Sequence, residues 1–233
     1  MVDSSFNIDP DIRRAFTAPS AVYTDPALFE RMKDAIFART WHLAADIDDV
    51  RVPRQARPVT LLEGLLDEPL LLTRDKDDQL HCLSNVCTHR GNLVVEEPGQ
   101  CSHLRCRYHG RRFGLDGSFE YMPEFEDVEG FPSEADNLPR VSFEEWGRFV
   151  FVSLKPAFAF DDLIEDINRR LGWLPWQEFM RAPDRSRDYL VKANWAMYCE
   201  NYLEGFHIPF VHADLNATLD YGEYSTELFQ YSN

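Results

Sequence analysis

The sequence predicts an α+β protein in which a short helical segment precedes an all-β region and a second helical region follows. Apolar residues recur at helical spacing from Leu28 to Phe37, which predicts a helix over about 25–39. Short apolar runs separated by turn residues then indicate an all-β region. Helical spacing returns where the composition shifts near residue 156. These observations divide the chain into residues 1–40, 41–155 and 156–233.

The N-terminal segment is expected to contain one helix. Thr24 is the predicted N-cap, and Asp25-Pro26 would occupy the first turn, where an acidic side chain and proline are both favoured. The polar residues before Thr24 predict no regular structure. The first five residues contain no apolar run, so we expect no secretory signal.

The β region is expected to form several short strands joined by turns. Strands are predicted at the runs 41–44, 59–62, 70–73, 80–86, 113–118 and 149–152. Asp116-Gly117 is the clearest turn signal. Beyond Pro156, apolar spacing predicts one helix from Asp161 to Leu171 and a second over about 194–207.

Composition narrows the class of protein and its partners. The chain has 24 basic and 40 acidic side chains, a formal charge of −16, which disfavours a nucleic-acid partner. An acidic surface suits electrostatic encounters with other proteins, although solubility alone explains it equally well. No run of eighteen apolar residues exists, so no membrane span is expected. Five cysteines, an odd number, argue against a disulfide scaffold and favour reduced thiols in the cytoplasm.

Two segments of the β region combine a cysteine, a histidine and a glycine. They read Cys87-Thr88-His89-Arg90-Gly91 and Cys106-Arg107-Tyr108-His109-Gly110. Two thiolates and two imidazoles on paired loops are the ligand set of a Rieske [2Fe-2S] cluster, in which histidines replace two cysteines on one iron. The glycines allow tight turns, and imidazole ligation gives an outer edge through which an electron can leave. Cys82, Cys101 and Cys199 are then expected to be buried structural thiols.

A structural zinc site is the alternative for the same four side chains, since Cys2His2 sites are common. Zinc motifs, however, usually pair cysteine with cysteine and histidine with histidine. The sequence has one of each in both segments, which favours the cluster.

A second group of polar residues lies near the end of the predicted helix 194–207. Glu204 and His207 are three positions apart, so on a helix they share a face. Pro209 is expected to end the helix and let His212 turn back toward His207. Two histidines and a carboxylate are the facial triad of non-haem Fe(II). The alternative is that two histidines near a helix end are incidental.

The first group, followed by Phe-Gly-Leu-Asp-Gly at 113–117, resembles the Rieske domain of ring-hydroxylating oxygenase α subunits over roughly 81–119. Respiratory Rieske proteins have an extra disulfide-forming cysteine beside each ligand pair, and this chain has none there. One departure is Arg111-Arg112, where the family commonly has an aromatic residue, which weakens any expectation about surface packing at that position. Residues 194–212 resemble the mononuclear iron segment of the same family.

The resemblance implies a specific architecture. An all-β Rieske domain at 41–155 is inserted after an N-terminal helix that packs on the catalytic part. The first, incomplete part of an α+β, helix-grip-like catalytic domain follows at 156–233. Leu228-Phe229 is expected to start one of its strands. The family's third iron ligand, an aspartate, lies well beyond the second histidine, so we expect an N-terminal part of a longer protein or a truncated copy.

The resemblance also implies roles for the second group. His207 and His212 become ligands of a mononuclear Fe(II). Glu204 takes the place of an acidic residue, usually aspartate, that bridges a Rieske histidine of one subunit to the iron histidine of its neighbour. Asn201 lies near the iron, where its amide orients a water or ligand, or else makes a structural helix-to-loop hydrogen bond. Asp214 and Asp220 do not match the position of the third ligand.

The implied function is that of a terminal oxygenase component. Electrons from NAD(P)H pass through a reductase or ferredoxin to the [2Fe-2S] cluster, leave through His109 and reach the Fe(II), where O2 is activated to hydroxylate a small substrate. The tail of the sequence resembles both aromatic-ring hydroxylases and choline monooxygenase-like members. A cytoplasmic homotrimer is implied, because the two metal sites meet only between neighbouring chains. The rival interpretation is a Rieske electron carrier or an inactive remnant.

Overall fold

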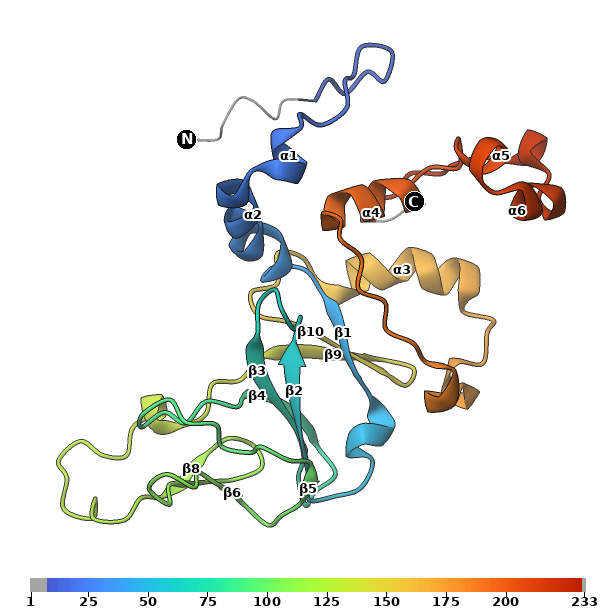
Figure 1. The fold of residues 1–233 in the computed structure, drawn as a ribbon. Helices are drawn as coiled ribbons and strands as arrows, with labels where there is room; N and C mark the ends of the chain where they lie inside the picture. Colours follow the sequence, from blue (N-terminus) through green and yellow to red (C-terminus); the bar gives the residue numbers. More distant parts are fainter. Residues whose placement is uncertain (1–7, 232–233) are drawn as a thin grey trace.

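The computed structural model describes residues 8–231 and confirms the α+β class. Small antiparallel sheets form the middle of the molecule, with helices on either side of them in the sequence (Figure 1). The strands are β1 His42–Asp46, β2 Gln55–Leu61, β3 Glu68–Arg74, β4 Leu80–Ser84, β5 Gly99–Gln100, β6 Leu104–Arg105, β7 Arg112–Phe113, β8 Phe119–Tyr121, β9 Ser142–Trp146 and β10 Phe149–Ser153. The α-helices are α1 Ala21–Thr24, α2 Pro26–Met32, α3 Phe160–Leu171, α4 Trp195–Tyr202, α5 Ile208–Val211 and α6 Ala213–Thr218. Single turns of other helix types are η2 Lys33–Phe37, η3 Ile47–Val50, η4 Glu134–Asp136, η5 Trp176–Glu178, η6 Pro183–Arg185 and η7 Tyr221–Glu223.

The strands form three sheets in the orders β1-β10-β9, β4-β3-β2-β5 and β6-β7-β8. The central strand β3 explains why two cores form. Its side chains alternate between faces, so Leu71 joins a core with the two predicted cluster cysteines, whereas Leu70 and Leu72 join a core with β10. The continuous apolar run of β3 is therefore buried on both faces.

The N-terminal helix starts one residue later than the sequence predicts. Asp25 is the N-cap of α2, because its extended backbone lets its carboxylate accept from the N–H of Ala27 at 2.8 Å. Thr24 instead ends the short α1, so the prediction of an irregular segment up to Thr24 is wrong there. The helical path continues from α2 through η2 to Phe37, close to the predicted end.

The N-terminal helices pack against α4. The Tyr23 hydroxyl donates to Glu200 at 2.7 Å, and the Asn194 amide donates to the Tyr23 carbonyl at 3.1 Å. The rings of Phe37 and Trp195 meet edge to face at 4.9 Å between centroids. These contacts join segments that are about 170 positions apart in the sequence.

Three predictions near the sites need correction. The helix expected over 194–207 ends at Tyr202, because the Glu204 carboxylate accepts from the Phe206 N–H in place of a helical carbonyl. The run 113–118 is a strand only as far as Phe113, after which a tight turn closes. Leu228-Phe229 is not a strand.

The three cysteines outside the predicted cluster differ in burial. All five cysteines are free thiols. Cys82 is buried in the core, and burial raises its pKa to about 12. Cys101 is partly buried, but Cys199 is exposed, so the prediction of three buried thiols is wrong for Cys199. Its helix α4 buries only Ala196.

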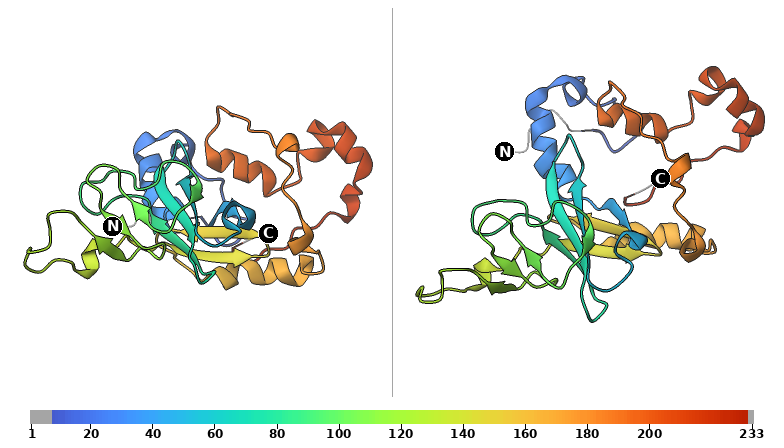
Figure 2. Two further views of the ribbon diagram at one scale, coloured as in Figure 1. Left: turned by 90° about the horizontal axis from the view of Figure 1, so that it is seen from below. Right: turned by 60° about the horizontal axis from the view of Figure 1, so that its bottom comes forward.

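Within residues 8–231 no helix is long and apolar enough to cross a membrane. The first five residues, on which the expectation about a secretory signal rests, lie outside this described range. The C-terminal helices α5 and α6 lie at one end of the molecule, and the small sheet β6-β7-β8 lies at the other, in both views of Figure 2 as in Figure 1.

Candidate functional site

The two cysteine–histidine segments fold into hairpin loops with the same hydrogen-bond frame. In each loop the cysteine N–H donates to the carbonyl five residues later, at 2.8 Å for Cys87 and 2.9 Å for Cys106. The N–H of Gly91 or Gly110 donates back to the cysteine carbonyl, at 3.0 Å in both loops. These glycines have φ values of +70° and +77°, a left-handed conformation that glycine adopts at little cost. The local sequence therefore builds two equivalent cradles.

The loops bring all four predicted cluster ligands together. The Cys87 and Cys106 thiols are both buried in the same core. The rings of His89 and His109 lie 4.8 Å apart between centroids, inclined at 70°. His89 is partly exposed and His109 is exposed, so the sulfurs lie inside and the imidazoles lie outside.

This arrangement fits the donor set of a [2Fe-2S] cluster with two thiolates on an inner iron and two imidazoles on an outer one. Among residues 8–231 no three His, Cys, Asp or Glu side chains converge on a single metal ion. The buried sulfurs and the outer imidazoles match the two sides of such a cluster.

The protonation of the metal-free ligands suits this role. Burial raises the pKa of the Cys87 thiol, and the neighbouring Cys106 raises it further. Burial also lowers the pKa of His89, and the neighbouring His109 acts in the same direction. His89 is therefore held neutral, the form in which an imidazole binds metal, while each thiol must lose its proton as iron binds.

Residues that no sequence pattern singled out hold the first loop in place. Asn85 is buried just before the loop, where its amide donates to the Val95 carbonyl at 2.7 Å and its oxygen accepts from the Val95 N–H at 2.9 Å. The Thr88 hydroxyl donates to the carbonyl of Asp136 at 2.8 Å. Ser133 and Asp136 form a capping box, and its Ser-x-x-Asp spacing is the pattern in the sequence that could have marked this segment.

Arg111, one of the two arginines that depart from the family's pattern, is buried. Its guanidinium lies among the rings of Phe113, Phe119 and Phe131. It therefore occupies an aromatic environment in the interior, next to the second loop. Its partner is Asp136, at 2.6 Å.

The second group of predicted ligands flanks the short helix α5. His207 precedes α5 and His212 follows it, and their rings lie 5.2 Å apart between centroids. Pro209 lies in the first turn of α5, where its missing N–H costs nothing, so it starts this helix rather than ending the previous one. Glu204 and His207 belong to the turn before α5 and do not share a helix face, contrary to the prediction.

Glu204 and His207 are nevertheless in direct contact. The His207 Nδ1 lies 2.6 Å from Glu204 Oε1. The hydrogen bond from His207 lowers the pKa of the Glu204 carboxyl below its usual value, as does the Phe206 N–H, so this side chain is ionised near neutral pH. A neutral His207 that donates through Nδ1 has its Nε2 free for a metal.

Within residues 8–231, neither of the later aspartates joins the two candidate iron ligands. Asp214 lies in the first turn of α6, and the Asp220 carboxylate accepts from the Gly222 N–H at 3.0 Å as a cap. Neither joins the two histidines in a group of three. Asn201 is exposed in the last turn of α4. His207 and His212 thus remain the candidates for two of the three ligands of a facial triad.

The family model of the Rieske [2Fe-2S] domain matches residues 40–132 of the sequence. The family model of the ring-hydroxylating α subunit catalytic domain matches residues 179–231. The chain belongs to the family of Rieske oxygenase α subunits. It is 32% identical to choline monooxygenase of Amaranthus tricolor over 92% of its length, and 28% identical to the carnitine monooxygenase oxygenase subunit of Acinetobacter pittii over 89%.

A solved relative supports the same assignment. The structure of a quaternary ammonium Rieske monooxygenase, described as revealing carnitine oxidation and inter-subunit electron transfer, superimposes with a TM-score of 0.69. That comparison has 28% identity and covers 83% of this chain and 53% of the relative. The chain spans about half the length of the curated relatives it matches, 49% of the Amaranthus protein and 55% of the Acinetobacter protein.

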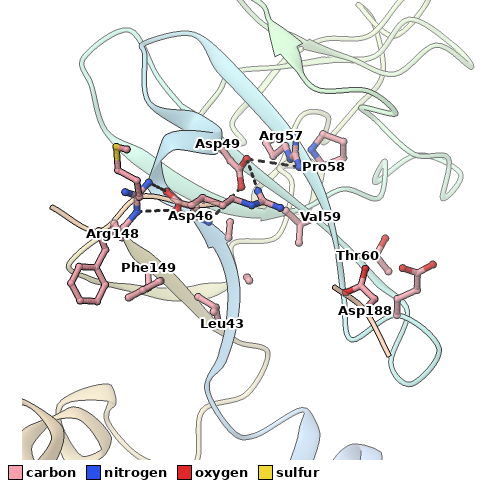
Figure 3. A pocket seen from close by; sticks show the side chains of 16 residues that line it. Leu43, Asp46, Asp49, Arg57, Pro58, Val59, Thr60, Arg148, Phe149 and Asp188 are labelled. Atoms are coloured by element: carbon pink, nitrogen blue, oxygen red, sulfur yellow. Dashed lines mark hydrogen bonds and ion pairs between the residues drawn. The ribbon is translucent and has the colours of Figure 1, made fainter. Parts of the chain in front are cut away.

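One pocket of this family member lies away from both ligand sets. It measures about 850 Å³ and is bounded by β1, β2 and the segment around residues 179–188 (Figure 3). Its wall contains ion pairs, with Asp46 bound to Arg148 at 2.8 Å and Asp49 close to Arg57 and Arg181. None of the six predicted metal ligands lines it.

Proposed function

We propose that this chain is part of the terminal oxygenase component of a Rieske non-haem iron oxygenase, which hydroxylates a small organic substrate with O2. Cys87, His89, Cys106 and His109 would hold the [2Fe-2S] cluster, and His207 and His212 would hold the mononuclear Fe(II). When bound, the cluster supplies one-electron transfer and the Fe(II) supplies O2 activation. The observation that carries the proposal is the pair of equivalent loops, which bury two thiols and expose two imidazoles.

Glu204 supports the second part of the proposal. One carboxylate oxygen accepts from His207, which orients the ring and leaves Nε2 for the metal. Each carboxylate oxygen has two acceptor positions, and the Glu204 side chain is 34% exposed, so it can accept a further hydrogen bond from outside the chain. The exposed His109 of a neighbouring subunit is the proposed donor.

This bridge leads to a homotrimer as the proposed assembly. The two ligand sets lie at opposite ends of the molecule, on the β6-β7-β8 side and beside α5 (Figure 2). A contact between His109 of one subunit and Glu204 of the next would bring them together. The description of the related monooxygenase, which names inter-subunit electron transfer, supports this arrangement. Asn201 is proposed to lie near the iron, where its exposed amide would orient a water or ligand.

A reductase or ferredoxin supplied by NAD(P)H is the proposed electron donor, and the cytoplasm is the proposed location. For substrate we favour a small quaternary ammonium compound over an aromatic ring, because the relatives described above are choline and carnitine monooxygenases. The division into an N-terminal segment at 1–40, a Rieske domain at 41–155 and a catalytic part from 156 belongs to the same proposal.

Iron content and O2 uptake of the purified protein test this function. We expect about three irons per chain, two in the cluster and one mononuclear. We also expect O2 uptake that depends on both a reductase and a quaternary ammonium substrate. His212→Ala should leave about two irons and abolish uptake. About two irons in the unmodified protein, without uptake, would favour the electron carrier, and a colourless zinc protein would favour the structural site. Uptake with an aromatic substrate alone would correct the substrate class.

A further inference from the structure

Arg111 is a buried cation immediately beside the second cluster loop. Only 2% of its surface is exposed. Its guanidinium carbon lies 5.0 Å from the ring centroid of Phe119 and 5.6 Å from those of Phe113 and Phe131. The rings remove water from around the charge, so its field is weakly screened. A permanent positive charge in such a place is costly and calls for a compensating role.

Asp136 connects this cation to both loops. Arg111 donates from Nη2 to the Asp136 carboxylate at 2.6 Å and to its backbone carbonyl at 3.1 Å. The same carbonyl accepts from the Thr88 hydroxyl of the first loop at 2.8 Å. The other carboxylate oxygen is held by the N–H and hydroxyl of Ser133. Asp136 thus connects the two loops through hydrogen bonds to Arg111 and Thr88.

The cation of Arg111 belongs to the second loop itself. The Arg111 carbonyl accepts from the Cys106 N–H at 2.9 Å, the hydrogen bond that closes this loop. Arg111 is also only two positions from His109 in the sequence. A buried positive charge at this position favours any state of the site that carries more negative charge.

We propose that Arg111 is a positioning residue that locks the two loops through Asp136 and, by its buried charge, raises the reduction potential of the cluster. This inference rests on the proposed function, because it assumes that the loops hold a [2Fe-2S] cluster. Reduction adds one negative charge to the cluster, and a nearby buried cation stabilises that charge. The ion pair therefore sets how readily the site accepts an electron.

The test is a redox titration of the purified iron-loaded protein, followed by circular dichroism, on three variants. Arg111→Met removes the cation while leaving Asp136 negative, and should lower the equilibrium constant for reduction about tenfold, or about 59 mV for a one-electron couple. Asp136→Asn leaves the cation without its counter-charge and should raise that constant. Arg107→Met makes the same change of charge in the same loop, but the Arg107 side chain is 77% exposed, so water should hold the change below about threefold.

Opposite shifts of the reduction potential in Arg111→Met and Asp136→Asn are the result that supports the proposal. A purely structural role would weaken cluster binding in both variants and would not shift their potentials in opposite directions. Shifts of the same sign, or an Arg111→Met shift no larger than that of Arg107→Met, would overturn the proposal. If Arg111→Met does not retain iron, the sign of the Asp136→Asn shift decides alone. Failure of the unmodified protein to bind a [2Fe-2S] cluster would instead refute the proposed function.

Discussion

Replacing Gly91 by alanine should destabilise the first loop through its backbone alone. Gly91 has a φ of +70°, and a Cβ built on it meets no atom within 4 Å. No clash contributes, so the cost is that of an L-residue in the left-handed region, about 1–2 kcal/mol. The ratio of folded to unfolded protein then falls about 5- to 30-fold. The hydrogen bond from the Gly91 N–H to Cys87 depends on that conformation.

Two further substitutions, Gly99→Ala and Gly91→Asn, separate the effect of the left-handed backbone from that of the added side chain. Gly99 in β5 also has open space around an added Cβ but no positive φ, so Gly99→Ala should be neutral or stabilise by about 0.4–1 kcal/mol. Gly91→Asn should cost less than Gly91→Ala, because asparagine tolerates the left-handed region. Urea unfolding of the metal-free protein measures all three free energies. Equal effects of Gly91→Ala and Gly99→Ala would refute this account of the loop.

Three other predictions concern the second site, the ion pair near β1 and the iron itself. Glu204→Gln should lower Fe(II) affinity in a chelator competition about 10- to 100-fold without loss of cluster iron, whereas Glu223→Gln, an exposed carboxyl in the same segment, should change neither. Burial raises the pKa of Asp46, but hydrogen bonds from Arg148 and a backbone N–H outweigh it and lower that pKa. Asp46→Asn should therefore destabilise at pH 7, and the difference from the unmodified protein should shrink as the pH falls below about 4, since protonation removes the same interaction. Removing iron with a chelator should lower the urea midpoint of unfolding, because the metals bind only the folded state.

The two loops with the candidate cluster ligands were predictable, because each cysteine–histidine pair lies within four residues of the chain. A local turn, enforced by Gly91 or Gly110, suffices to shape each loop, and the sequence alone reveals such turns. The fold class was predictable for a similar reason, since the period of the apolar residues reports which face of each element is buried. Local patterns therefore indicated both the Rieske domain and the two loops that carry the predicted ligands.

Long-range contacts account for what the sequence did not reveal. Asp136 reaches the loops across 25 and 48 positions of the chain, and no periodicity marks such a pairing. The end of α4 at Tyr202 also escaped prediction, because a side-chain carboxylate competes with the helical hydrogen bonds there. A run of good helix formers cannot show that competition. Glu204 and His207 are nevertheless in contact, through a turn rather than along a helix.

The two loops share one pattern of backbone hydrogen bonds but differ in the position of the histidine. His89 lies two residues after its cysteine, and His109 lies three residues after its own. The frame therefore places the sulfurs equivalently, while the shifted histidine gives the two imidazoles unequal access to solvent. Two loops with the same backbone therefore give the site two different sides. The His89 ring faces the Phe125 side chain, whereas the His109 ring, 3.9 Å from that of Tyr108 between centroids, is accessible to a molecule that binds at this end.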